Sequence, residues 1–167
     1  MKIAFVGTVS SGKTTLAKRV AEELNGIYVE ELARKYIEVF GKKNIKPEDQ
    51  LFIAILQGQL EMEMRKMFPN ELLVFDTPML LNKIYYKFYN DNSSLLDFFF
   101  DLFKYDIIFY LKPLEYKIDK ARFQTIEERN KIDELIKENI NFVEVPEIDF
   151  DKRLNFVINY IKNYKSD

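Results

Sequence analysis

The 167-residue sequence contains no cysteine and no histidine. Disulfides, thiol nucleophiles, acid–base chemistry based on histidine and ordinary zinc sites are therefore excluded. Any catalysis must rely on carboxylates, lysine, arginine, hydroxyls, backbone N–H groups or a hard metal ion such as Mg²⁺.

The sequence also lacks a strong excess of charge of either sign. Its 25 basic and 27 acidic residues leave a net charge of −2. This balance gives no electrostatic reason to expect nucleic acid or a membrane surface as a partner.

Long apolar runs are missing as well, and none approaches the length of a membrane span. The richest apolar segment, residues 95–103, is interrupted by Asp97 and Asp101. The opening residues MKIAFVG have too short an apolar part for a signal peptide. We therefore expect a soluble cytoplasmic protein.

The length and the order of elements predict one domain covering residues 1–167. Short apolar runs bounded by turn residues predict strands at 2–6, 27–29, 72–76, 106–111 and 141–145. Amphipathic spacing predicts helices at 13–24, 31–40, 47–68, 81–89, 95–103, about 115–139 and 149–164. Alternating strands and helices favour parallel pairing through right-handed crossovers. The expected fold is α/β, a three-layer open sheet of about five mainly parallel strands with helices on both faces.

Residues 7–14, GTVSSGKT, match the pattern G-x-x-x-x-G-K-[ST] without a mismatch, between a predicted strand and a predicted helix. Glycines let the backbone curl so that its N–H groups point at phosphate oxygens, and the helix start adds its positive dipole. Lys13 would reach the β- and γ-phosphates, and the Thr14 hydroxyl would bind Mg²⁺. The predicted nucleotide-binding residues are Gly7, Val9, Ser10, Ser11, Gly12, Lys13, Thr14 and Thr15.

Asp76 ends the buried strand predicted at 72–76. A carboxylate at this edge of the sheet would reach Mg²⁺ through a water, which makes Asp76 and Thr14 the predicted metal ligands. The alternative is that Asp76 caps the helix that follows, because Asp-Thr-Pro also resembles a helix start.

Residues 130–133, NKID, match the guanine-reading N-K-x-D motif of GTPases. They lie inside a highly charged segment with helical spacing, and no D-x-x-G follows Asp76. We interpret residues 130–133 as a coincidental, solvent-exposed helical face.

Charged residues for an acceptor and for the transferring phosphoryl group follow the strands. Glu30, Glu31 and Arg34 come after the second strand, where ligands meet the carboxyl edge of such a sheet. Arg122 and Arg129 lie in the charged stretch after the strand at 106–111, where a lid could close. The alternative for each arginine is a solvated helix surface.

Four segments, GTVSSGKTT, EELARKYIEVFG, LLVFDT and YKIDKARFQTIEERNKI, resemble the nicotinamide riboside kinase domain of NadR-type proteins and related AAA-like P-loop ATPases and kinases. The resemblance covers roughly residues 3–160 and implies a P-loop NTPase fold of the nucleoside-kinase type. It implies that residues 12–15 hold the triphosphate, that Asp76 serves Mg²⁺ or acceptor activation, that Arg122 and Arg129 are lid arginines, and that Gln57 faces the acceptor. The family's aromatic residue before E-x-x-R is Glu30 here, and its second acid after the third strand is Pro78.

The expected activity is transfer of the γ-phosphoryl group of ATP, with Mg²⁺, to a hydroxyl of a nucleoside-like acceptor, with nicotinamide riboside as the leading candidate. The expected catalytic residues are Lys13, Asp76, Arg122, Arg129 and Glu31, and the expected acceptor residues are Glu30, Glu31, Arg34, Gln57 and Asp76. Asp76, or alternatively Glu31, would take the acceptor proton. A kinase for another nucleoside or nucleotide, or a regulatory P-loop ATPase, are the alternatives, and the sequence leaves a homo-oligomer open.

Overall fold

The computed structural model describes residues 1–41, 46–90, 94–114, 124–146 and 149–164. Five strands form one sheet in the order β2-β3-β1-β4-β5, and every neighbouring pair is parallel. The strands are β1 (Lys2–Val6), β2 (Ile27–Val29), β3 (Leu73–Asp76), β4 (Ile107–Tyr110) and β5 (Val143–Glu144). The predicted open parallel sheet of five strands is confirmed.

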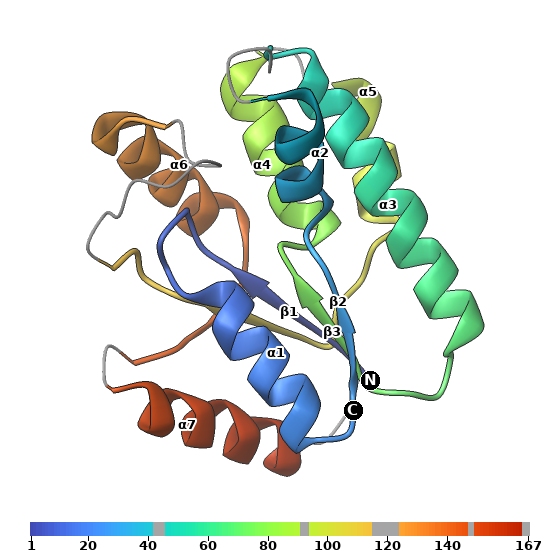
Figure 1. The fold of residues 1–167 in the computed structure, drawn as a ribbon, viewed down its shortest axis with the longest axis vertical. Helices are drawn as coiled ribbons and strands as arrows, with labels where there is room; N and C mark the ends of the chain where they lie inside the picture. The colour runs from blue at the N-terminus through green and yellow to red at the C-terminus, as the bar shows by residue number, and fades with distance from the viewer. Residues whose placement is uncertain (42–45, 91–93, 115–123, 147–148, 165–167) are drawn as a thin grey trace.

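Helices cover both faces of this sheet (Figure 1). They are α1 (Lys13–Glu23), α2 (Leu32–Phe40), α3 (Asp49–Met67), α4 (Met79–Tyr89), α5 (Ser94–Asp101), α6 (Ile126–Asn139) and α7 (Phe150–Asn163). Ile3 and Phe5 of β1 pack in the cluster that α1 and α7 cover, whereas Ala4 and Val6 pack in clusters on the other face. This alternation along one strand explains why β1 reads as an unbroken apolar run, since both of its faces are buried.

Helix α6 begins later than the charged segment suggests. Thr125 accepts a hydrogen bond from the backbone N–H of Glu128, and the Glu128 carboxylate accepts one from the backbone N–H of Thr125. This capping box fixes the first turn at Ile126. The earlier part of the predicted helix, residues 115–123, lies outside the described residues.

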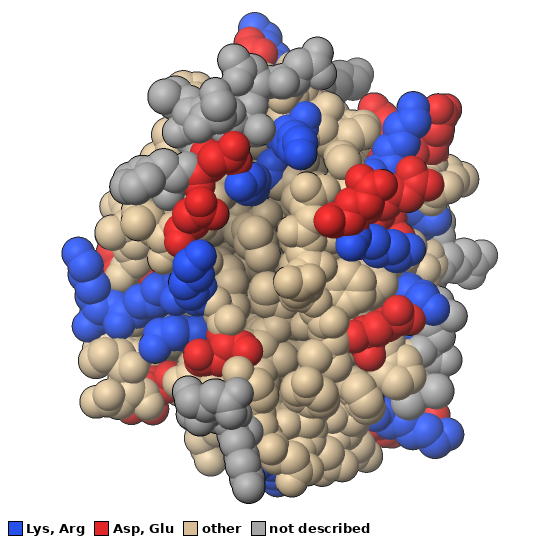
Figure 2. Space-filling view, turned by 180° about the vertical axis from the view of Figure 1, so that it is seen from behind, with Lys and Arg blue, Asp and Glu red and all other residues tan. Residues whose placement is uncertain are grey.

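The charges on the surface are mixed in sign. Figure 2 shows Lys, Arg, Asp and Glu in neighbouring groups around the margin of one face, with a largely uncharged surface between them. Among the described residues, no helix is long and apolar enough to span a membrane.

A buried carboxyl group that the sequence did not reveal joins α3 to the start of α4. Glu61 is fully buried, and its Oε1 accepts a hydrogen bond of 2.6 Å from the backbone N–H of Met79. Its Oε2 accepts one of 2.6 Å from the Tyr105 hydroxyl and lies 3.5 Å from the Arg65 guanidinium. Burial raises the pKa of Glu61 from 4.5 to about 7, against the lowering effect of these partners.

We expect Glu61 to make stability depend on pH. Because its pKa is higher in the folded chain than in the unfolded chain, the associated stabilisation is complete in acid and is lost as the pH rises through about 7. The difference corresponds to about 3 kcal/mol of unfolding free energy between about pH 5 and pH 8. Urea unfolding of Glu61→Gln should lack this part of the pH slope, whereas Glu63→Gln, at an exposed position on α3, should keep it. Identical slopes in both variants would contradict the assignment.

Candidate active site

The loop between β1 and α1 has the conformation that its glycines permit. Gly7 has φ 144°, and a Cβ at this position would lie 2.4 Å from the carbonyl oxygen of Leu111. Gly12 has φ 86° and precedes the first residue of α1. Both positions exclude ordinary side chains, so the two glycines of the motif are required by the backbone.

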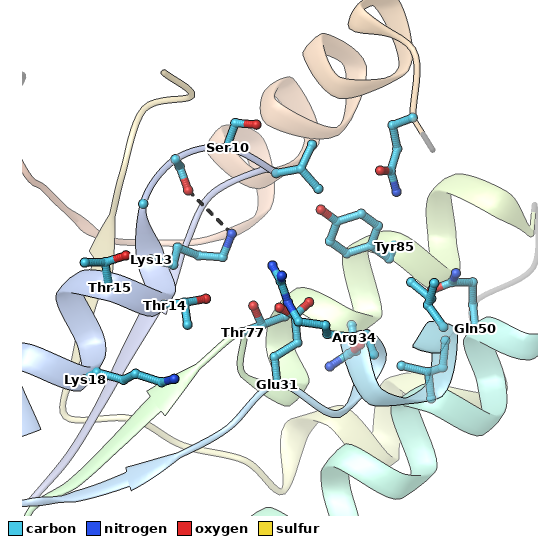
Figure 3. A pocket seen from close by; sticks show the side chains of 18 residues that line it. Ser10, Lys13, Thr14, Thr15, Lys18, Glu31, Arg34, Gln50, Thr77 and Tyr85 are labelled. Atoms are coloured by element: carbon cyan, nitrogen blue, oxygen red, sulfur yellow. Dashed lines mark hydrogen bonds between the residues drawn. The ribbon is translucent and has the colours of Figure 1, made fainter. Parts of the chain in front are cut away.

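Lys13 closes this loop on itself (Figure 3). Its ammonium group donates hydrogen bonds of 2.9 Å to the carbonyl oxygens of Gly7 and Thr8, and one of 3.4 Å to Ser11 Oγ. Ser11 Oγ also donates to the Thr8 carbonyl at 2.9 Å. The loop therefore has a defined shape, and the lysine cation lies at the place where a phosphate would compete for it.

A cavity of about 420 Å³ extends from this loop across the carboxyl edge of the sheet. At one end it is lined by Val9, Ser10, Ser11, Gly12, Lys13, Thr14, Thr15 and Lys18. At the other end it is lined by Glu31, Ala33, Arg34, Ile37, Gln50, Ile53, Thr77, Asn82, Tyr85 and Gln124. One continuous cavity thus joins the predicted phosphate site to groups from α2, α3 and α4.

Glu31 is the carboxylate that faces this cavity. It immediately precedes α2, and Figure 3 shows Glu31 and Arg34 projecting from the start of that helix toward Lys13 and Thr14. Burial raises the pKa of Glu31 and the Asp76 charge adds to the rise, whereas Lys13 and Arg34 oppose it. The ionisation of Glu31 therefore depends on burial and on the charges of Lys13, Asp76 and Arg34.

Gln57 fixes the backbone on both sides of Glu31. It is fully buried on α3, and its Oε1 accepts a hydrogen bond of 3.0 Å from the backbone N–H of Leu32. Its Nε2 donates one of 3.2 Å to the carbonyl oxygen of Glu30. Gln57 does not line the cavity, so the structure gives it a positioning role, and direct contact with an acceptor stays a prediction.

Asp76 lies behind the cavity lining and is fully buried at the end of β3. Its Oδ2 accepts a hydrogen bond of 2.9 Å from the Tyr28 hydroxyl, and its Oδ1 has no hydrogen-bond partner among the described residues. The capping alternative is wrong: the residue before α4 is Pro78, no side chain of that residue caps the helix, and the N–H of Met79 bonds to Glu61.

The donor set fits Mg²⁺. Thr14 lines the phosphate end of the cavity, and the free oxygen of Asp76 is a buried acceptor that lacks a donor. The described residues contain no group of three or more acidic side chains that would hold a metal alone. One carboxylate and one hydroxyl suit an ion that takes most of its remaining ligands from phosphates and water.

The other predicted residues lie at different distances from the cavity. Glu30 makes an ion pair of 2.6 Å with Lys35 and does not line the cavity. Arg129, on α6, donates a hydrogen bond of 3.2 Å to the carbonyl oxygen of Leu114. Arg122 lies outside the described residues, so the lid remains a prediction.

Sequence reasoning missed several polar residues of the acceptor end, including Gln50, Asn82 and Tyr85. Gln50 on α3 is 7% exposed, and Asn82 and Tyr85 on α4 also line the cavity. Burial raises the pKa of Tyr85, with a further rise from the Glu31 charge, so its hydroxyl stays protonated and can donate. These residues lie in predicted helices, but no local signal shows which side of each helix faces a ligand.

The interpretation of residues 130–133 as solvent-exposed is wrong for two of them. Asn130 and Lys131 are exposed, but Ile132 and Asp133 are buried on α6. Both Asp133 carboxylate oxygens accept from the Tyr110 hydroxyl at 2.9 Å, and one lies 2.6 Å from Lys137 Nζ. The segment is helical as predicted, and its aspartate binds the end of β4.

We expect Asp133→Ala to lower stability without changing the choice of nucleotide. The substitution removes the acceptor of a buried tyrosine hydroxyl, which typically costs about 1–3 kcal/mol of unfolding free energy. The ratio of ATP to GTP affinity should stay at the wild-type value, because Asp133 does not line the cavity. Lys131→Ala is the exposed control from the same motif. A shift toward ATP or GTP in Asp133→Ala would contradict this role.

Solved structures of kinases share this fold. NadR protein in complex with NR is similar at 24% identity and TM-score 0.75, over 97% of this chain and 50% of that one. Deoxyadenosine kinase from M. mycoides, with products dCMP and dCDP bound, is similar at 17% identity and TM-score 0.72, over 98% and 100%. Thymidylate kinase from Ehrlichia chaffeensis is similar at 19% identity and TM-score 0.68, over 97% and 96%. The chain thus spans half the length of the NadR chain and nearly all of the other two.

A comparison with curated protein sequences finds no match. The family model AAA_28, described as an AAA domain, matches residues 2–153. That range includes the phosphate loop, Glu31 and Asp76. The chain belongs to the AAA_28 family of P-loop domains.

Proposed function

We propose that the protein is an ATP- and Mg²⁺-dependent kinase that phosphorylates a hydroxyl of a nucleoside-like small molecule. The observation that carries this proposal is one continuous cavity with Lys13 and Thr14 at one end and Glu31, Gln50 and Asn82 at the other. A phosphate donor and an acceptor hydroxyl can meet in such a cavity. An ATPase that uses only water has no need of the second, side-chain-lined end.

Lys13 and the N–H groups of the loop would spread the charge of the transferring phosphoryl group. Thr14 and Asp76 would hold Mg²⁺, and the ion would supply positive charge that offsets the negative charge of the phosphates. Arg34, one turn after Glu31, would add a cation at the acceptor end.

Glu31 is the better candidate for the base that takes the acceptor proton. It lines the cavity, and burial raises its pKa, which makes its carboxylate a stronger base than an ordinary glutamate. Asp76 does not line the cavity, and its Oδ2 is already bonded to Tyr28. The sequence left the two carboxylates as alternatives for the base. In this proposal Glu31 would accept the proton and Asp76 would bind the metal ion.

The acceptor end combines apolar and amide groups in the way that a nucleoside requires. Ile37 and Ile53 offer apolar surface for a flat ring, while Gln50 and Asn82 offer donors and acceptors for its edge. The similar NadR structures are complexes with NR and with NAD and AMP-PNP, which supports nicotinamide riboside as the first acceptor to test and ATP as the donor. Deoxyadenosine kinase and thymidylate kinase support other nucleosides and nucleotides as the next.

The experiment measures ADP formation from ATP and Mg²⁺ with and without each acceptor. The panel contains nicotinamide riboside, deoxyadenosine, deoxycytidine, thymidine and dTMP, and the control is the best nucleoside without its 5′-hydroxyl. We expect one or a few acceptors to raise ADP formation and to gain a phosphate, and EDTA to abolish both. ADP formation that no acceptor changes would identify an ATPase and overturn the proposal.

A further inference from the structure

Helix α3 exposes an apolar stripe on the side that faces away from the sheet. Phe52 is 55% exposed, Ile55 44%, Leu56 43% and Met62 39%. Their spacing places them on one side of the helix, opposite the buried residues Gln50, Ile53, Ala54, Gln57, Gly58 and Glu61. Figure 1 shows α3 at the outer edge of the molecule. Gln59 and Glu63, which are hydrogen-bonded to each other at 2.9 Å, lie on the same side and interrupt the stripe. Exposed apolar residues gathered on one helix side are a feature of interaction sites.

The two ends of this stripe carry opposite charges. Glu48 and Lys66 are 18 residues apart, which is about five helical turns, so they lie on the same side as the stripe. Both side chains are exposed, and neither makes an ion pair within the described part of the chain. When a second copy of this helix is turned through 180°, its basic end faces the acidic end of the first copy, and its acidic end faces the basic end.

We propose that two copies of the chain form a homodimer by pairing their α3 helices antiparallel, about a two-fold axis beside residue 57. This arrangement places Glu48 next to Lys66 of the partner subunit, and the symmetry repeats the pair at the other end. Phe52 then lies beside Met62 of the partner subunit, and Leu56 beside its own counterpart. The inference does not depend on the proposed function.

The length of the stripe sets the angle between the two helices. Residues 48 and 66 are separated by about 27 Å along the helix axis. A crossing angle of about 20° keeps the two helices in contact over that length. A crossing angle of about 50° would confine the contact to the central turns and separate both charge pairs. We therefore infer the shallow crossing.

The end of α2 extends the surface beside the start of α3. Val39 is 76% exposed and Phe40 is 53% exposed. Tyr36, whose ring centroid lies 4.5 Å from that of Phe40, donates a hydrogen bond of 3.0 Å to Asp49. Stable interfaces bury about 800 Å² per partner, more than one helix side offers. The apolar residues at the end of α2 supply the additional area.

The first test is the mass of the full-length chain in solution, by light scattering after gel filtration and by sedimentation. We expect twice the 20.0 kDa of one chain. Leu56→Glu, which puts a charge next to the axis, should give a folded monomer by circular dichroism. Tyr160→Glu, at an exposed apolar position on α7, should stay dimeric. A monomeric wild type, or a dimer that survives Leu56→Glu, overturns the proposal.

The second test exchanges the charges at the ends of the stripe. Glu48→Lys or Lys66→Glu alone turns two attractive pairs into two repulsive ones and should weaken the dimer about tenfold or more. The double variant Glu48→Lys/Lys66→Glu should restore wild-type affinity. A double variant that is as weak as the singles contradicts the antiparallel pairing.

The third test uses the absence of cysteine, which removes any background thiol. Leu56→Cys places one thiol within about 3 Å, along the helix axis, of its counterpart and should form a disulfide-linked dimer on oxidation. Phe52→Cys places it about 15 Å away along the axis and should not cross-link. The reverse result would overturn the proposed axis.

Discussion

Lys13→Ala should lower acceptor-dependent phosphoryl transfer by about 100-fold or more, as expected for a group that stabilises charge in the transition state. Lys13 is the cation of the phosphate loop, and its ammonium already lies among the loop carbonyls. Alanine removes that charge and leaves α1 intact, because the Lys13 backbone contributes to the helix without its side chain. The measurement is the rate of phosphorylated acceptor formation at saturating ATP and acceptor.

The matched control is Arg19→Ala, which removes a half-exposed cation from the same helix, where it pairs only with Glu22 and Glu23. This variant should turn over like the wild type. ADP binding by calorimetry separates the two contributions of Lys13, since a loss of affinity alone would reflect ground-state binding. Wild-type turnover in Lys13→Ala would remove the phosphate loop from the mechanism.

Glu31→Gln should lower kcat by about 100-fold to 10,000-fold, the range for a lost general base. The pH dependence of kcat tests the same role of Glu31. A base works when deprotonated, so the wild-type rate should fall on acidification, and it should fall at a higher pH than an ordinary glutamate would give, because the pKa of Glu31 is raised by burial and by Asp76. The slow residual rate of the glutamine variant should lack this acidic limb.

Glu30→Gln is the control, because Glu30 precedes Glu31 in sequence but pairs with Lys35 and does not line the cavity. Its kcat and pH profile should match those of the wild type. Asp76→Asn provides the opposite comparison. It should raise the Mg²⁺ concentration needed for half-maximal rate, and it should keep the acidic limb but move it to lower pH, because the Asp76 charge no longer raises the pKa of Glu31. If Asp76→Asn removes that limb and Glu31→Gln keeps it, the roles of the two carboxylates are reversed.

The sequence alone predicted the sheet and the phosphate loop because both depend on local patterns. Strands β1, β3 and β4 are short apolar runs that are largely buried in the sheet. The loop needs glycine at positions 7 and 12 because the backbone has a positive φ at both. The ends of the second and third strands also predicted Glu31 and Asp76, because parallel neighbouring strands bring their carboxyl ends to the same edge of the sheet. The family resemblance added Gln57.

The parts that the sequence did not predict depend on contacts between distant elements. Asp133 looked like one more charge on a solvated helix, and only the packing of α6 on β4 shows that the Tyr110 hydroxyl occupies it. Gln50 and Tyr85 line the cavity because of the way α3 and α4 are oriented about their axes. Sequence periodicity predicts which side of each helix faces the core, but it does not predict which side faces a ligand. The sequence did not reveal the role of Glu61 either, because its partners Met79 and Tyr105 come from distant parts of the chain.

Helix α3 also restricts how this chain can change over evolutionary time. Its inner side carries Gln50 for the cavity, Gln57 for the loop around Glu31, and Glu61 for the start of α4. Even Gly58 is constrained, because a methyl group there would lie 2.9 Å from the Phe99 ring. A mutation that alters acceptor choice from α3 therefore disturbs the support of the site at the same time. We expect descendants of this sequence with new acceptors to have acquired their first substitutions on α4, at Asn82 and Tyr85, which line the cavity and do not hold the backbone around Glu31.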